Sequence, residues 1–328
     1  MQNTLLKKRD VFIDVAKAIC MLLVVANHME AFESIGGPLM FVAVPMFFFM
    51  SGMYDRSEKD IIEVVPKLLR TLLLPAIIWL VIGTMFSFFL NIIKSTMEGE
   101  GHELIFDINI PSKYNLPVWF LFALLYVKLL VLGLLKLEPR PMVLLGISVL
   151  LGYVGATYQM PMSIDEGLAA TPFYCAGKYF YPYLNKLSKN IWLNIIGVLF
   201  FMTFILGPLS FFISPIGNHL YNCYFIIPMV GVLFAFIPLF SLSKKLVNVL
   251  FLQKFGQNTL GVLVVHLLLC MIMDRIAWRL FERGTMEWYI LSFVFYLIVV
   301  MVSFYLSIII KNHWPILLGI KKQMRKDS

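Results

Sequence analysis

The sequence has 328 residues, of which 60% are hydrophobic and 14% are charged, and its formal net charge is +8. A soluble globular chain carries ~45–50% apolar and ~25% charged residues, so this composition excludes a soluble enzyme, a disordered chain and a disulfide scaffold. The basic residues are scattered along the chain and form no nucleic-acid motif. We therefore expect no nucleic-acid partner, and we interpret the positive charge as retention on the cytoplasmic side of a membrane.

Ten apolar runs follow one another, each close to the ~20 residues that cross a bilayer as a helix. The run at 167–185 is the weakest, because it holds Thr171, Pro172 and Lys178. We expect an all-α, polytopic membrane protein with about ten transmembrane helices, folded as a single integral-membrane domain over 1–328. The predicted runs are 11–33, 36–54, 68–93, 116–136, 141–158, 167–185, 190–213, 220–241, 256–281 and 286–312.

The distribution of basic residues predicts the orientation of these runs. If the N-terminus lies in the cytoplasm, most of the 27 lysines and arginines fall in segments on the inner side. The outer loops then hold only Lys94, Lys113 and Arg283. Because cytoplasmic loops are enriched in Lys and Arg, we expect both termini in the cytoplasm and an even number of helices.

The first run carries polar residues that should be rare in a membrane helix, since a charge at mid-membrane costs ~2.5–3.5 kcal/mol on insertion scales. Asp14 and Lys17 are i,i+3 neighbours that can pair. Lys17 and His28 lie about 20° apart around the helix and about 16 Å apart along it, so they share one face. Histidine is the natural general base near neutral pH. A structural helix satisfied by its neighbours is the alternative, but three polar residues on one face favour a site that takes a charged ligand and transfers protons.

Other polar residues give weaker signals. His266 alone is interpreted as a packed, hydrogen-bonded residue, and Ser51 lacks the GxSxG context of a nucleophile, although the Ser51-Gly52 step permits close helix approach. Trp119 fits an aromatic belt at the outer interface, and Lys178 either faces a cavity or snorkels to the inner interface. The five histidines have no ligand spacing among them, so we expect no metal site.

Several stretches, taken in order, point to a known family. They are Asp14, Lys17 and His28 in the first run, VPMFFFMSG at 44–52, LLLP at 72–75, PVWFL at 117–121, TPFYCAG at 171–177, and FGQNTL at 255–260 with His266. In order and spacing they resemble the membrane acyltransferase-3 family. The similarity is nearest to its branch of fucose 4-O-acetylase-like and enterobacterial-common-antigen-type O-acetyltransferases, and it covers nearly the whole chain.

The resemblance implies a ten-helix, multi-pass enzyme of the bacterial inner membrane. Such an enzyme moves an acyl group, usually acetyl from acetyl-CoA, to a sugar hydroxyl of a surface or secreted glycan. It implies no bound cofactor, with acetyl-CoA as co-substrate and a glycan or glycan-lipid as acceptor. The family's first-helix motif is an arginine, ten residues, then a histidine. His28 fits the histidine, whereas Lys17 stands in place of the arginine and offers a point charge instead of a planar fork.

A mechanism that fits both the resemblance and the polar residues assigns three catalytic candidates. His28 deprotonates the sugar hydroxyl or briefly accepts the acetyl group as a covalent relay; Lys17 holds the donor, and Asp14 keeps Lys17 charged and placed. The candidates for positioning donor or acceptor are Asn27, Ser51, Trp119, Lys178, Asn258 and His266, and either Asn258 or Thr259 can cap the helix that follows it. The cations available for the CoA phosphates on the cytoplasmic side are Arg56, Lys67, Arg70 and Lys244.

Two other classes of function fit the same composition. A transporter or flippase for a glycan-lipid also needs ten helices and intramembrane charges, but it moves intact lipid and releases no CoA thiol. A sensor or scaffold without turnover tolerates replacement of Lys17 and His28. Consumption of a donor thioester therefore distinguishes an acyltransferase from a transporter or flippase. Loss of function on replacing Lys17 or His28 distinguishes it from a sensor or scaffold.

Overall fold

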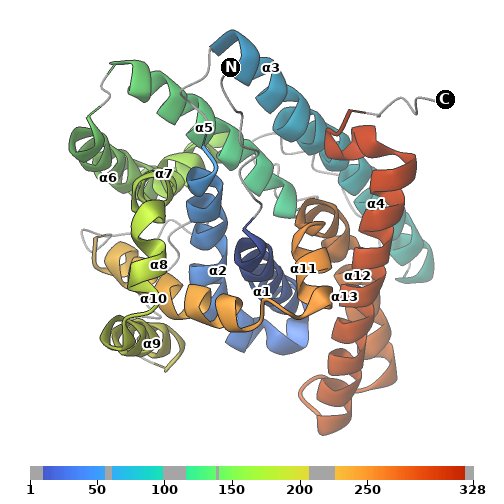
Figure 1. Ribbon diagram of the computed structural model, residues 1–328. Helices are drawn as coiled ribbons and strands as arrows, with labels where there is room; N and C mark the ends of the chain where they lie inside the picture. The colour runs from blue at the N-terminus through green and yellow to red at the C-terminus, as the bar shows by residue number, and fades with distance from the viewer. Residues whose placement is uncertain (1–9, 56–60, 99–115, 138–139, 207–225, 322–328) are drawn as a thin grey trace, which may run out of the picture.

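The computed structural model describes residues 10–55, 61–98, 116–137, 140–206 and 226–321, and within these ranges the chain forms helices and no strand (Figure 1). Within the described residues each of the ten predicted runs is occupied mainly by one helix or helical stretch, although the first run is interrupted after Asn27, and the all-α prediction is confirmed for this part of the chain. The α-helices are α1 (Val11–Asn27), α2 (Glu33–Met53), α3 (Ile61–Leu68), α4 (Leu74–Glu98), α5 (Trp119–Leu137), α6 (Pro141–Thr157), α7 (Ile164–Phe180), α8 (Leu184–Leu187), α9 (Ile191–Leu206), α10 (Ile226–Lys245), α11 (Leu250–Gly256), α12 (Thr259–Leu280) and α13 (Met286–His313).

Long apolar helices with exposed apolar faces make this a multi-pass membrane protein. Among the described residues, five helices are long and apolar enough to cross a bilayer: Ile61–Phe89, Trp119–Leu137, Ile226–Lys245, Thr259–Leu280 and Met286–His313. Large apolar side chains are exposed along α9 and α13, for example Trp192 at 71% and Phe293 at 53%. A surface of this kind is rare on a water-soluble monomer and suits contact with lipid. The expected total of ten spans remains a prediction.

The most polar predicted run forms a central helix of the bundle. α7 packs against α2, α5 and α6, and its residues 169–177 are all buried. A helix that contacts protein on every side does not need the hydropathy of a lipid-facing one, which explains the weak signal. A Cβ atom at Gly52 would overlap the carbonyl of Tyr174, and one at Gly177 would overlap the carbonyl of Phe49. These two glycines let α2 and α7 approach closely, as the Ser51-Gly52 step predicted.

The first helix is shorter than predicted. α1 ends at Asn27 and is followed by a short 3₁₀ turn, η1 (Glu30–Phe32), so the predicted continuation to residue 33 is wrong. The backbone N–H of Glu30 donates to the Asp274 carboxylate over 3.3 Å instead of continuing the helical ladder. His28 is therefore the first residue beyond α1, where the chain turns away from the helix.

Polar contacts define the two ends of the bundle. At one end, which we call the Asp55 end, Lys178 of α7 pairs with Asp55 over 2.9 Å, and the hydroxyl of Tyr181 donates to the carboxylate of Asp10. At the opposite end, which we call the Glu30 end, Glu30 contacts both Asp274 and, over 3.2 Å, Arg283. α1 runs through the centre of the bundle from the Asp55 end toward the Glu30 end (Figure 1).

Candidate active site

The predicted ion pair of the first helix is present near the Asp55 end. Lys17 Nζ lies 3.9 Å from Asp14 Oδ1, and the two side chains are 27% and 3% exposed. The same ammonium lies over the ring of Tyr54, 5.5 Å from its centroid. Because Tyr54 follows directly after α2, the charge of Lys17 sits where α1 and α2 come together.

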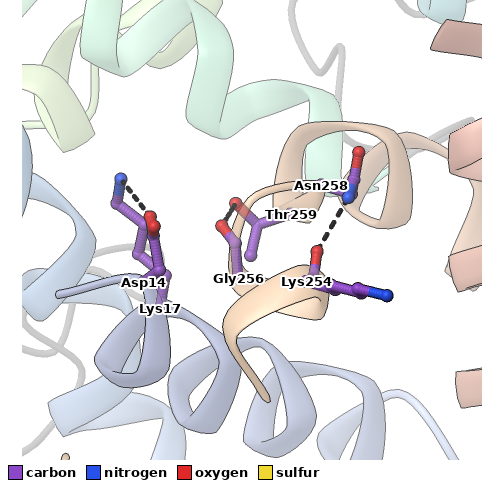
Figure 2. Close-up of polar contacts among 6 residues, drawn as sticks. All are labelled: Asp14, Lys17, Lys254, Gly256, Asn258 and Thr259. Atoms are coloured by element: carbon purple, nitrogen blue, oxygen red, sulfur yellow. Dashed lines mark hydrogen bonds and ion pairs between the residues drawn. The ribbon is translucent and has the colours of Figure 1, made fainter. Parts of the chain in front are cut away.

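The turn between α11 and α12 packs directly on α1 (Figure 2). A Cβ atom at Gly256 would overlap the carbonyl oxygen of Asp14, so the glycine of the FGQNTL stretch is required for this contact. The Thr259 hydroxyl donates to the Gly256 carbonyl over 3.4 Å, and the Asn258 side-chain amide donates to the Lys254 carbonyl over 2.7 Å. Neither side chain caps α12, so the predicted capping role is wrong.

His28 lines a partly open apolar space of about 220 Å³, which we call the His28 cavity. Its polar lining side chains are His28, Trp119 and Thr259, and its apolar walls come from α1, α2, α5 and α12. Trp119 thus lies half-buried at a cavity wall. Water-poor surroundings strengthen electrostatic interactions with any group that reacts there.

A second histidine lies against the first. The ring of His266, on α12, is 5.2 Å from the ring of His28 between centroids, with 47° between their planes. His266 is fully buried, and its Nδ1 lies 2.9 Å from the carbonyl oxygen of Val262. The prediction of a packed, hydrogen-bonded residue is confirmed, but its contact with His28 could not be derived from the separation of the two residues in the sequence.

A larger and more polar space of about 450 Å³ opens near the Asp55 end; we call it the lysine cavity. Lys67 of α3 and Lys128 of α5 line it together with Asp55, Glu63 and Thr71. Lys128 Nζ donates to the Tyr174 hydroxyl over 3.2 Å, and the charges near enough to act on it are those of Asp55, Lys67 and Lys178. Lys128 was not among the predicted site residues, although a lone charge in an apolar run was a usable signal.

The two cavities share one wall residue. Leu72 lines both the His28 cavity and the lysine cavity. It belongs to η2 (Leu69–Leu73), a single π-helical turn between α3 and α4. Such turns are rare in helices and frequent at functional sites. Leu72 therefore stands between the two spaces.

The remaining predicted residues lie away from both cavities or outside the described ranges. Lys244 donates to Asn185 over 2.9 Å and to Ser188 over 2.6 Å, beside α8. Asn258 is hydrogen-bonded to Lys254 and, over 3.4 Å, to Lys311. Neither cavity is lined by Ser51, Asn27 or Arg70. Two of these residues have a buried polar atom without a hydrogen-bond partner, Asn27 Oδ1 and Arg70 Nε. Arg56 falls outside the described residues.

Two further observations bear on what the site can hold. Within the described ranges, no three His, Cys, Asp or Glu side chains lie together as metal ligands would. A family model described as an acyltransferase domain matches residues 10–312, a range that contains every residue of both cavities. No curated protein and no solved structure matches the chain.

Proposed function

The chain belongs to the membrane acyltransferase-3 family, and from this premise we propose that it is an O-acyltransferase that moves acetyl from cytoplasmic acetyl-CoA to a sugar hydroxyl of a surface or secreted glycan. The enzyme class follows from the family. The donor, the acceptor and the location in the inner membrane of a bacterium are our proposal, and they rest on the two cavities and on the resemblance of the sequence motifs.

The lysine cavity is the proposed entrance for the donor. CoA carries phosphates, and the ammonium groups of Lys67 and Lys128 offer charge-assisted hydrogen bonds to them. Lys178 and Lys17 lie beside this space through their contacts with Asp55 and Tyr54. By the positive-inside rule the Asp55 end, with its lysines, faces the cytoplasm, which is where acetyl-CoA is available.

The passage at Leu72 is the proposed route for the reactive end of the donor. The pantetheine arm is a narrow chain, and the apolar His28 cavity suits its thioester better than it suits a charged group. In this arrangement the phosphates stay with Lys67 and Lys128 while the acetyl carbonyl reaches His28. The same separation of charged and apolar groups excludes water from the reacting centre.

Transfer at His28 follows general acid–base logic. The imidazole takes the proton of the sugar hydroxyl, the oxygen bonds to the acetyl carbonyl carbon, and the carbon–sulfur bond breaks. The leaving thiolate then takes that proton, so the products are the acetyl ester and free CoA thiol. A covalent variant, in which the imidazole carries the acetyl group between donor and acceptor, uses the same residue.

The single observation that carries this proposal is the meeting of the two cavities at Leu72, with cations in one and a histidine in the other. A flippase needs a polar route for an intact glycan headgroup. The His28 cavity has a volume of about 220 Å³ and mostly apolar walls. It is therefore poorly suited to passing a glycan headgroup and well suited to holding a thioester beside His28.

The test uses inverted membrane vesicles that contain the protein and acetyl-CoA labelled in the acetyl group. We expect label in extracted glycan and release of CoA thiol, both reduced at least about 100-fold by His28→Ala. The matched control is His313→Ala, a histidine at the end of α13 that lines neither cavity. Label retained on the protein separates the covalent relay from direct transfer.

Either of two results would overturn the proposal. Unlabelled glycan and no CoA thiol in vesicles that hold the native acceptor would exclude acetyl transfer and turn attention to translocation of glycan-lipid. Equal transfer by the wild type and by His28→Ala would exclude His28 as the reacting base.

A further inference from the structure

A buried nitrogen with no partner lies next to the proposed catalytic base. Nε2 of His266 is buried and has no hydrogen-bond partner, in a side chain that is 0% exposed. Leaving a buried polar group unbonded costs roughly 1–3 kcal/mol. An unpartnered nitrogen at this position therefore needs an explanation, and the neighbouring ring of His28 is a candidate partner.

The hydrogen bond at the other nitrogen fixes the tautomer of His266. A carbonyl oxygen can only accept, so the contact between Nδ1 and the Val262 carbonyl requires a proton on Nδ1. In the neutral imidazole Nε2 then carries a lone pair and no hydrogen. The backbone of α12 thus holds His266 as a permanent hydrogen-bond acceptor at Nε2.

The two histidine rings are close enough for a hydrogen bond between them. A hydrogen bond of about 3 Å between one nitrogen of each ring corresponds to centroids about 5 Å apart, and the observed value is 5.2 Å. At this separation, an orientation of the half-buried His28 ring that points an N–H at His266 Nε2 makes that hydrogen bond. The other nitrogen of His28 then remains as a lone pair for the substrate hydroxyl.

We propose that His266 is the positioning residue of His28: its Nε2 accepts the hydrogen bond of the His28 ring, orients the base and stabilises the imidazolium that forms during transfer. This inference rests on the proposed function. His266 would act on His28 as the aspartate of a Ser-His-Asp triad acts on its histidine, with a neutral imidazole in place of the carboxylate. A neutral acceptor avoids burying a second charge inside the membrane, where an unpaired carboxylate would be costly.

Two substitutions at position 266 separate the two nitrogens. His266→Asn keeps a donor near the position of Nδ1, for the Val262 carbonyl, and removes the acceptor. His266→Gln places an amide oxygen near the position of Nε2 and removes the Nδ1 donor. The assay measures release of CoA thiol against acetyl-CoA concentration in vesicles that hold the native glycan, so that kcat and KM are obtained separately.

We expect His266→Asn to lower kcat about 100-fold while the KM for acetyl-CoA changes less than about two-fold. We expect His266→Gln to recover at least about ten-fold of that loss. Equal loss in both variants, or full kcat in His266→Asn, would overturn the positioning role. A wild type without His28-dependent thiol release would instead overturn the proposed function, so the two failures are distinct.

A spectroscopic measurement does not depend on the stability of the position-266 variants. In protein with ¹⁵N-labelled histidine, the His266 signals should show a protonated Nδ1 and an accepting Nε2. The Nε2 signal should shift when His28 is replaced by alanine. An Nε2 that carries the proton, or one that is indifferent to the removal of His28, would contradict the inference.

Discussion

The ammonium of Lys178 lies 2.9 Å from the carboxylate of Asp55, which joins the last turn of α7 to the end of α2 beside the lysine cavity. The two side chains are 14% and 11% exposed, so the pair is largely withdrawn from solvent. Its position matters for function, because Asp55 also lines the lysine cavity. The pair holds two central helices at the proposed donor entrance.

We expect Lys178→Met to lower the thermal stability of the detergent-solubilised protein more than the double variant Asp55→Asn with Lys178→Met does. Removing one partner of a largely buried pair takes the nearest counterion from the other charge, a loss of up to roughly 3–5 kcal/mol, whereas neutralising both is far milder. The melting temperatures of the wild type, both single variants and the double variant measure this. Additive losses would contradict a direct interaction between the two side chains.

Replacing Lys67 should weaken binding of the donor without changing the chemistry. A hydrogen bond to a charged group contributes roughly 1.5–3 kcal/mol, so Lys67→Gln should raise the KM for acetyl-CoA about 10- to 100-fold with little change in kcat. Lys136→Gln is the matched control, because Lys136 is exposed at the end of α5 and does not line the cavity. A loss confined to kcat would place the CoA phosphates elsewhere.

A larger side chain at position 72 should block the proposed route between the cavities. Leu72→Trp is expected to reduce acetyl transfer at least about ten-fold, because the thioester no longer reaches His28, while CoA itself still binds in the lysine cavity. Calorimetric titration with CoA checks the binding, and labelled glycan checks the transfer. Full transfer by Leu72→Trp would mean that the donor takes another route.

A methyl group at position 256 should disturb the contact between α11 and α1. Gly256→Ala places a Cβ against the backbone of Asp14, which cannot move as a side chain would, and overpacking of this kind costs roughly 1–3 kcal/mol. We expect a lower melting temperature in detergent. Gly133→Ala is the control, since nothing lies within 4 Å of an added Cβ there, and a loss of equal size in that variant would argue against the close contact.

The sequence predicted the helices and the Asp14–Lys17 pair of α1 because both depend on short-range patterns, whereas His28, predicted to share a helix face with Lys17, lies beyond the end of α1. Runs of apolar residues and the i,i+3 spacing of Asp14 and Lys17 are local features, and both are confirmed. The end of α1 was missed because it depends on Asp274, a residue from the other end of the chain. Charge inside an apolar run singled out Lys17 and would equally have singled out Lys128.

The assembly of the cavities could not be read from the sequence. Nothing in the sequence distinguishes Leu72 from other apolar residues. It becomes a cavity wall only through the packing of α1, α2, α5 and α12 around it. Likewise, the tautomer of His266 depends on a backbone carbonyl, and its function depends on the approach of α12 to the end of α1. Both are properties of tertiary packing, for which one sequence holds no local pattern.

The π-helical turn at Leu69–Leu73 makes the length of this segment significant. A π turn holds one residue more than an α turn, so deletion of one residue there would restore a continuous α-helix. Because the wider turn takes up the extra residue, α3 and α4 would keep nearly the same facing relative to each other after the deletion. Lys67 would stay at the lysine cavity, whereas the widened turn that carries Leu72 would be lost. The extra residue thus changes the helix locally at the wall between the two cavities, and a homologue one residue shorter here would differ at that wall while keeping the cation of α3.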